Sequence, residues 1–196
     1  MTPLHLAQAL HAARRRPLSS RYLWVDRASW KEEVQLASGE VVVVGRVAAT
    51  DRHGLPVARH GSQRRWQITF PGGAPVWESD ALTQPLSLEI EHGRYFVAAD
   101  IHSRLLRTEY GEPEGGVLFF RWQQDAWMRI ARQDYPRNAR VNLLRSPWGR
   151  ASSEDAHGLV RHEDKQLRPG NELVHVPLDA RIANRARACH ALRNVA

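Results

Sequence analysis

Between positions 30 and 131 the chain repeats one pattern, in which apolar residues occupy every second position of short segments separated by turn residues. The segment 64–70, RRWQITF, alternates three large apolar residues with polar ones. Successive side chains of a β-strand point to opposite faces of a sheet, so this pattern predicts strands with one buried face. Because short turns join the segments, we expect them to pair antiparallel.

Two connections are predicted as hairpins. The dipeptide His92-Gly93 joins 85–91 to 94–101, and two-residue turns of this kind favour glycine because they need positive φ angles. Gly93 is therefore expected to have a positive φ. The segment 117–131 holds two apolar stretches on either side of a short polar turn, which predicts a further hairpin.

The segment 30–47 departs from simple alternation. Its first half alternates, but four consecutive valines, Val41–Val44, follow a short turn. A strand that is apolar on both faces belongs in the centre of a sheet or beneath a second layer. We therefore predict a central strand at Val41–Val44, with helices at the two chain ends as its candidate covers. Substitution of Val43 by Asp is then expected to unfold the domain.

These patterns predict a mainly β (α+β) fold, an antiparallel sandwich or strongly curved sheet with N- and C-terminal helices. A chain of 196 residues fits a single domain, 1–196. We place its parts at 1–20 (N-terminal helix), 30–147 (antiparallel β core) and 148–196 (polar region and C-terminal helix).

Helical spacing of apolar residues marks both ends of the chain. It covers 3–14 near the N-terminus and 179–193 near the C-terminus, where Cys189 falls on the apolar stripe and is predicted to be a buried thiol. In the polar region before the second helix we expect a short helix at 153–167 and a short strand at 173–176.

No stretch is long and apolar enough to span a bilayer, and the N-terminal basic cluster follows the apolar stretch instead of preceding it. The sequence therefore predicts no secretory leader and a cytoplasmic location. The single cysteine excludes an intramolecular disulfide and a cysteine-cluster metal site.

The chain carries a formal net charge of +7, and 26 of its 28 basic residues are arginine. Arginine binds phosphate oxygens with two parallel hydrogen bonds, so the bias is compatible with nucleic acid as a partner. It is also compatible with a genome whose base composition favours arginine codons, and we favour this second origin because charge alone says little about partners.

The sequence contains no recognised catalytic, cofactor-binding or metal-binding motif, and its ten histidines lack the spacing of zinc ligands. We predict no catalytic residue, no cofactor and no metal. Whether Asp100, His102 and Glu109 meet in one pocket stays open, because spacing along the chain does not show which side chains converge across a cleft.

The arginine-rich stretch 121–150 is the predicted partner-binding surface. Strand alternation at 126–131 assigns Met128 and Ile130 to the core, which leaves Trp127 facing outward beside arginine. Exposed tryptophan and arginine are typical of interface hot spots. The alternative is that this tryptophan packs under a loop and that the arginines are only solvated. The predicted partner-binding residues are Trp127, Arg129, Arg132, Arg137 and Arg140.

Several segments together resemble an uncharacterised bacterial protein family. Two of its patterns, WKEEVxLxxGxxxVVxR and EYGxPxxxxxFFRWxxxxWxRI, fit 30–46 and 109–130. Ser38 stands where the family has a turn aspartate. The resemblance implies no known activity, cofactor or site. The matching stretches, in order, are 30–46, 65–70, 85–93, 109–130 and 142–144.

From these observations we expect a non-enzymatic interaction module that binds a macromolecule, foremost a protein. A nucleic-acid-binding accessory protein is the first alternative, because of the arginine content. A hydrolase with an unrecognised site is the second.

Overall fold

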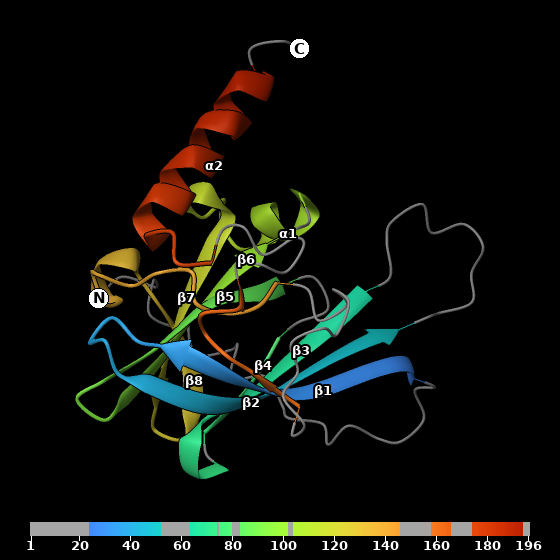
Figure 1. Cartoon of the computed structure of the whole chain (residues 1–196). Coiled ribbons are helices and arrows are strands. Elements are labelled where there is room, and N and C mark those ends of the chain that lie inside the picture. Colours follow the sequence, from blue (N-terminus) through green and yellow to red (C-terminus); the bar gives the residue numbers. More distant parts are fainter. Residues whose placement is uncertain are drawn as a thin grey trace.

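A computed structural model describes residues 24–51, 63–73, 75–79, 83–101, 104–145, 158–165 and 174–193. Strands dominate this part of the chain and form two separate sheets, neither of which closes on itself (Figure 1). The mainly β prediction is therefore confirmed. The N-terminal helix expected at 1–20 lies outside the described residues.

The first sheet has the strand order β4-β3-β2-β1-β9, and the second has the order β5-β6-β7-β8. All neighbours pair antiparallel except β1 and β9, which are parallel. The strands of the first sheet are β1 (Trp24–Gln35), β2 (Val41–Asp51), β3 (Gln63–Thr69), β4 (Val76–Glu78) and β9 (Leu159–Val160). Those of the second are β5 (Thr83–Glu91), β6 (Arg94–Ile101), β7 (Val117–Gln123) and β8 (Ala126–Ile130).

Five short or terminal helical elements complete the described part. The α-helices are α1 (Arg104–Glu109) and α2 (Leu178–Arg193). The 3-10 helices are η3 (Pro71–Gly73), η4 (Glu114–Gly116) and η5 (Arg132–Asp134).

The β5–β6 hairpin forms as its sequence predicts. His92 and Gly93 have φ angles of 51° and 71°, so both turn residues lie in the left-handed region. A turn with two positive φ angles has the twist that fits two antiparallel strands.

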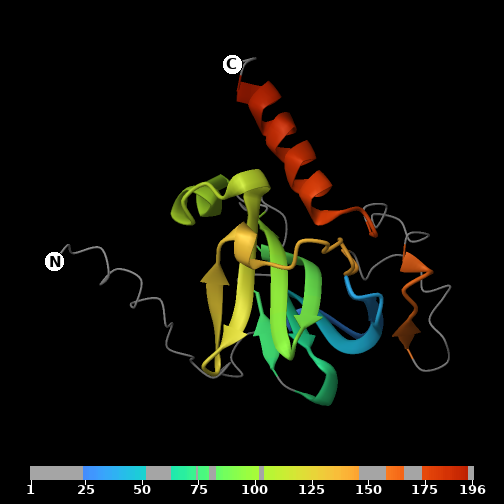
Figure 2. The same cartoon turned by 90° about the vertical axis from the view of Figure 1, so that its left-hand side faces the viewer.

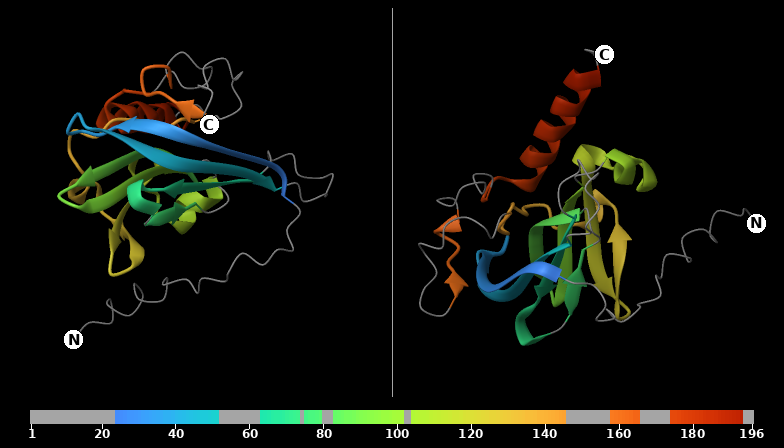
Figure 3. Two further views of the ribbon diagram at one scale, coloured as in Figure 1. Left: turned by 60° about the horizontal axis from the view of Figure 1, so that its bottom comes forward. Right: turned by 90° about the vertical axis from the view of Figure 1, so that its right-hand side faces the viewer.

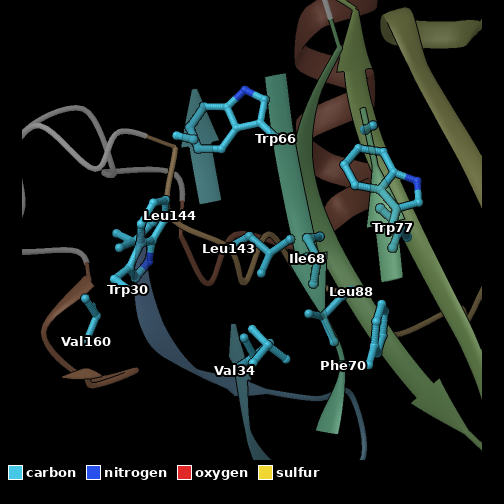
Figure 4. Close-up of a cluster of buried hydrophobic side chains, with 14 of the residues drawn as sticks. Trp30, Val34, Trp66, Ile68, Phe70, Trp77, Leu88, Leu143, Leu144 and Val160 are labelled. Atoms are coloured by element: carbon cyan, nitrogen blue, oxygen red, sulfur yellow. The ribbon is translucent and has the colours of Figure 1, made fainter. Parts of the chain in front are cut away.

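The main hydrophobic core lies between the two sheets (Figure 4). Trp30, Trp66 and Ile68 enter it from the first sheet, and Leu88 and Val97 enter it from the second. A second core covers the opposite face of the second sheet, beneath the start of α2. Strands β5 and β6 therefore have buried residues on both faces.

The prediction for Val41–Val44 is wrong in its main consequence. Strand β2 does lie in the middle of the first sheet, but β3 pairs with it only from Gly45 onward. Val41 and Val43 are 42% and 44% exposed, whereas Val44 is buried. The main core packs on the face of β2 that carries Val44, and in the described part of the chain Val41 and Val43 on the opposite face stay exposed. Val43→Asp is therefore not expected to unfold the domain.

Helix α2 lies far from these valines. Leu178 and Ile182, in its first two turns, pack in the second core. The rest of the helix projects away from both sheets, as three views show (Figures 1, 2 and 3). The side chain of Cys189 lies outside the described part of the chain, so the prediction of a buried thiol is not tested there.

The polar region was predicted less well. Residues 158–165 contain β9 and turns instead of the helix expected at 153–167. Val174 to Val176 form a turn and bend, so the strand expected at 173–176 is wrong there. This stretch is held by backbone hydrogen bonds in both directions with Val141, of 2.9 Å to Val176 and 2.6 Å from His175. No helix in the described part of the chain is both long and apolar enough to cross a membrane.

Candidate functional site

Two buried ionic clusters hold separate parts of the fold together. In the first, the fully buried carboxylate of Glu32 pairs with Arg46 Nη1 and Lys165 Nζ, each at 2.8 Å. The backbone N–H of Leu144 donates to the same carboxylate at 2.7 Å, and the Arg46 guanidinium lies over the Trp30 ring at 5.4 Å. The cluster joins β1, β2 and two later segments, and its side chains are buried, so we interpret it as structural.

The second ionic cluster is centred on Asp100, one of the three residues that the sequence left as candidates for a shared pocket. This buried carboxylate pairs with Arg181 at 3.2 Å and with Arg185, both from α2. Glu109, at the end of α1, is exposed, and His102 lies outside the described residues. Asp100 therefore anchors α2 to β6.

A cleft of about 470 Å³ opens where three segments far apart in the sequence meet. The turn after β1 contributes 37–38, the end of β5 contributes 89–91, and the connection after β8 contributes 133–138. Its volume is within the usual range for ligand sites in proteins.

Glu89 forms the floor of this cleft and is only 2% exposed. The backbone N–H of Ala37 donates to its Oε2 at 2.8 Å, and Asn142 Nδ2 donates to its Oε1 at 3.3 Å. Both donors are electrically neutral. Among the described residues no basic side chain forms an ion pair with Glu89.

Burial raises the pKa of Glu89 to about 7, although the hydrogen bond from Ala37 acts in the opposite direction. The negative charge of Glu91, two residues along β5, raises it further. A carboxyl group that lacks a counter-ion in a cleft is the kind of group that marks functional sites.

The wall formed by 133–138 is fixed from beneath by Tyr135. Its ring is buried against Phe96 and Phe119, with ring centroids 5.8 Å and 5.1 Å away. Its hydroxyl donates to Ser87 Oγ at 3.2 Å, and burial raises its pKa. The Tyr135 side chain therefore holds this connection against the second sheet.

Asn142 links the floor of the cleft to β5 and β1. Its side-chain carbonyl accepts from the Leu88 N–H at 3.0 Å, and its Nδ2 donates to Leu88 O at 2.9 Å and Gln35 O at 3.1 Å. The amide therefore satisfies backbone groups of Leu88 that no neighbouring strand reaches, and it places Glu89 beside the end of β1.

The charged residues of the cleft are mainly acidic. Glu91 and Asp134 are exposed at its rim, above the buried carboxyl of Glu89. Arg137 is the one basic residue in the lining, and it is exposed. In the described residues no group of three or more potential metal ligands occurs, here or elsewhere.

The structure corrects the orientation predicted for Trp127. Its indole Nε1 donates to Val76 O at 2.7 Å, and its ring packs on Phe70 and Trp122. Trp127 faces the main core, whereas Met128 is 50% exposed. The alternation was correct, but the first sheet covers the face that the sequence assigned to solvent.

The five predicted partner-binding residues have different contacts in the structure. Arg129 is exposed and donates to Tyr110 O at 2.9 Å, and Arg132 pairs with Asp179 of α2 at 2.6 Å. Arg140 is exposed beside Pro177, to which it forms an isolated backbone bridge. Of the predicted set, Arg137 alone lines the cleft.

Sequence reasoning missed Glu89. It lies on the polar face of 85–91 with Ser87 and Glu91, and this pattern indicates a strand face exposed to solvent. Ser87 and Glu89 are buried because the segment 132–142 crosses over this face. No local pattern predicts that crossing.

No family model, curated protein or solved structure matches the chain, so the resemblance to an uncharacterised bacterial family stays a prediction.

Proposed function

We propose that this chain is a non-enzymatic protein-binding module that holds an extended segment of its partner in the Glu89 cleft. The observation that carries the proposal is the cleft itself, about 470 Å³ in volume, with a buried carboxyl group at its floor that forms no ion pair with any described residue. That volume suits a few residues of a peptide.

The lining favours a protein segment over nucleic acid. Three acidic side chains, Glu89, Glu91 and Asp134, meet one basic side chain, Arg137. Nucleic-acid sites are rich in lysine and arginine because they neutralise phosphates, and acids at the rim would repel a phosphate backbone. The basic charge of the chain therefore lies outside this cleft.

The geometry also favours binding over hydrolysis. Covalent catalysis needs a nucleophile held beside a general base. Among the described residues no histidine or cysteine lines the cleft, and the Ser38 hydroxyl is exposed and accepts a hydrogen bond from the Glu40 N–H. These groups suit the binding of a ligand better than the activation of a nucleophile.

Site-specific photo-cross-linking tests the proposal. Benzoylphenylalanine replaces Ser38 or Asn138, which are exposed on opposite walls of the cleft, and as a control Glu78, which is exposed on β4. We expect Ser38 and Asn138 to cross-link to the same short segment of one protein, and Glu78 not to. A synthetic peptide of that segment should bind the purified chain, and Asp134→Arg should weaken it.

Two outcomes contradict this function. Cross-links from both walls to nucleic acid would support the nucleic-acid alternative. Cross-links to unrelated proteins, equal at Ser38, Asn138 and Glu78, would show that the cleft selects no partner.

A further inference from the structure

We infer that the cleft selects a cationic side chain, a lysine ammonium or an arginine guanidinium, which supplies a counter-ion that the described part of the chain does not provide to Glu89. This inference rests on the proposed function and names the feature of the partner segment that the cleft recognises.

The floor presents a carboxyl group whose interactions are incomplete. Ala37 and Asn142 donate one neutral hydrogen bond to each oxygen of Glu89. An ionised carboxylate can accept about four hydrogen bonds, so acceptor capacity remains. The buried Glu32 and Asp100 are each paired with two basic side chains, whereas Glu89, buried to a similar extent, has none among the described residues.

The rim adds charge of the same sign. Glu91 and Asp134 flank the opening, and with Glu89 they outnumber Arg137, so a cation gains from three carboxylates and meets one opposing charge. The turn at 37–38 contributes no charged side chain. The charged and titratable groups around Glu89 in the described part of the chain are Glu91 of β5 and Asp134, Tyr135 and Arg137 of the connection after β8. Strand register adds two arginines on the same face of the second sheet, Arg94 of β6 opposite Glu91 and Arg121 of β7 opposite Phe96.

Binding of a cation at this floor must be coupled to the protonation of Glu89. The free protein holds the carboxyl half protonated near neutral pH, because its pKa is raised to about 7. Only the ionised form attracts a cation strongly, so the observed dissociation constant is divided by the ionised fraction. That fraction rises about tenfold between about pH 6 and about pH 8, and affinity should rise with it.

Nuclear magnetic resonance provides a direct test, because the Ala37 amide proton points at Glu89 Oε2. The probes are three capped tripeptides with glycine on either side of lysine, arginine or the neutral norleucine. We expect the two cationic peptides to shift the Ala37 amide resonance at about pH 8 and to bind about tenfold more weakly at about pH 6. The norleucine peptide should bind weakly and equally at both pH values.

The decisive variant is Glu89→Gln, which keeps the size of the side chain and one acceptor oxygen but removes the ionisable group. It should lose both the preference for cations and the pH dependence. The matched control is Glu40→Gln, since Glu40 is exposed in the same turn but does not line the cleft. Spermidine forms a separate arm: if it binds more tightly than both cationic peptides, the site serves free polyamines and the inference of a protein side chain is overturned.

The result also separates this inference from the proposed function. If the cross-linked partner segment binds wild type and Glu89→Gln equally at both pH values, cation selection is wrong while the protein-binding function stands. If no segment cross-links in the cleft, the function is wrong. If the cationic peptides do not shift the Ala37 resonance, cation selection at this floor is wrong in either case.

Discussion

Arg46 of β2 and Glu32 of β1 are both fully buried and form an ion pair of 2.8 Å on the inner face of the first sheet. Lys165 reaches the same carboxylate from the segment after β9. Burial alone would raise the pKa of Glu32, but Lys165 and Arg46 lower it more, so it lies below its ordinary value. This carboxylate therefore contributes stability above its ordinary pKa, and the contribution is lost as the pH falls through the folded-state value.

The first prediction concerns removal of the Glu32 charge. Glu32→Gln leaves Arg46 and Lys165 buried without a counter-ion, and breaking a buried pair in this way costs about 3–5 kcal/mol of unfolding free energy. Urea denaturation measures the loss. The control is Glu33→Gln on the outer face of β1, where a smaller change, below about 1 kcal/mol, is expected. Equal losses in the two variants would contradict a structural role for the cluster.

The second prediction concerns the two faces of β2. Val44 is 1% exposed and Val43 is 44% exposed, although they are neighbours. Val44→Asp buries an unpaired carboxylate and should unfold the domain, whereas Val43→Asp should change the unfolding free energy by about 1 kcal/mol or less. Circular dichroism during heating distinguishes them, and similar melting of both variants would mean that both faces are covered.

The third prediction follows from the position of Trp127. Trp127→Ala removes packing on Phe70 and Trp122, and it should lower the unfolding free energy by about 3 kcal/mol. Trp127→Phe keeps most of that packing but loses the hydrogen bond to Val76 O, for a smaller cost of about 1 kcal/mol. Arg129→Ala, on an exposed side chain, should be nearly neutral. If Trp127→Ala left the unfolding free energy unchanged, Trp127 would face solvent, as the sequence predicted.

The fourth prediction tests how α2 is held. A Cβ at Gly115 would lie 2.8 Å from Ile182 O and 2.9 Å from Ile182 Cγ2, and Gly115 has a φ of +57°. Gly111 has a φ of +76° with no atom within 4 Å, so Gly111→Ala reports backbone strain alone. Gly115→Ala should cost at least about 1 kcal/mol more than Gly111→Ala, because Ile182 must move. Urea denaturation measures both losses of unfolding free energy. Equal losses would show that Ile182 moves away from a Cβ at position 115 without a measurable loss of stability.

The strands and hairpins were predictable from the sequence because their signals are local. Alternation placed Trp30, Val34 and Leu36 on the buried face of β1, and the His92-Gly93 turn has the predicted geometry. Each of these features depends on residues a few positions apart. The same holds for the alternation of β8, whose pattern was correct even though its covered face was not.

Burial by distant segments was not predictable in this way. The hydrogen bond from Ala37 to Glu89 spans 52 positions, and that from Leu144 to Glu32 spans 112. Alternation shows which side chains share a face, but not which later segment covers that face. Val43 was therefore predicted to be covered and is exposed, while Glu89, on the polar face of its strand, is buried and forms the floor of the cleft.

The last prediction uses the pKa of Glu89, which the fold raises to about 7. Between its ordinary value and that pKa the folded chain binds a proton that the unfolded chain has released, so the Glu89 contribution to stability falls as the pH rises and is constant above about 7. Glu89→Gln mimics the protonated form at every pH. Relative to wild type, it should therefore gain about 2–3 kcal/mol of unfolding free energy between about pH 5 and about pH 8. Urea denaturation of both proteins across this range measures the difference in their unfolding free energies. Groups such as Glu32 titrate in both proteins, so their contribution drops out of this difference. A difference that does not change with pH would mean that the pKa of Glu89 is the same in the folded and unfolded chains. Burial in the cleft would then not disfavour the ionised carboxylate.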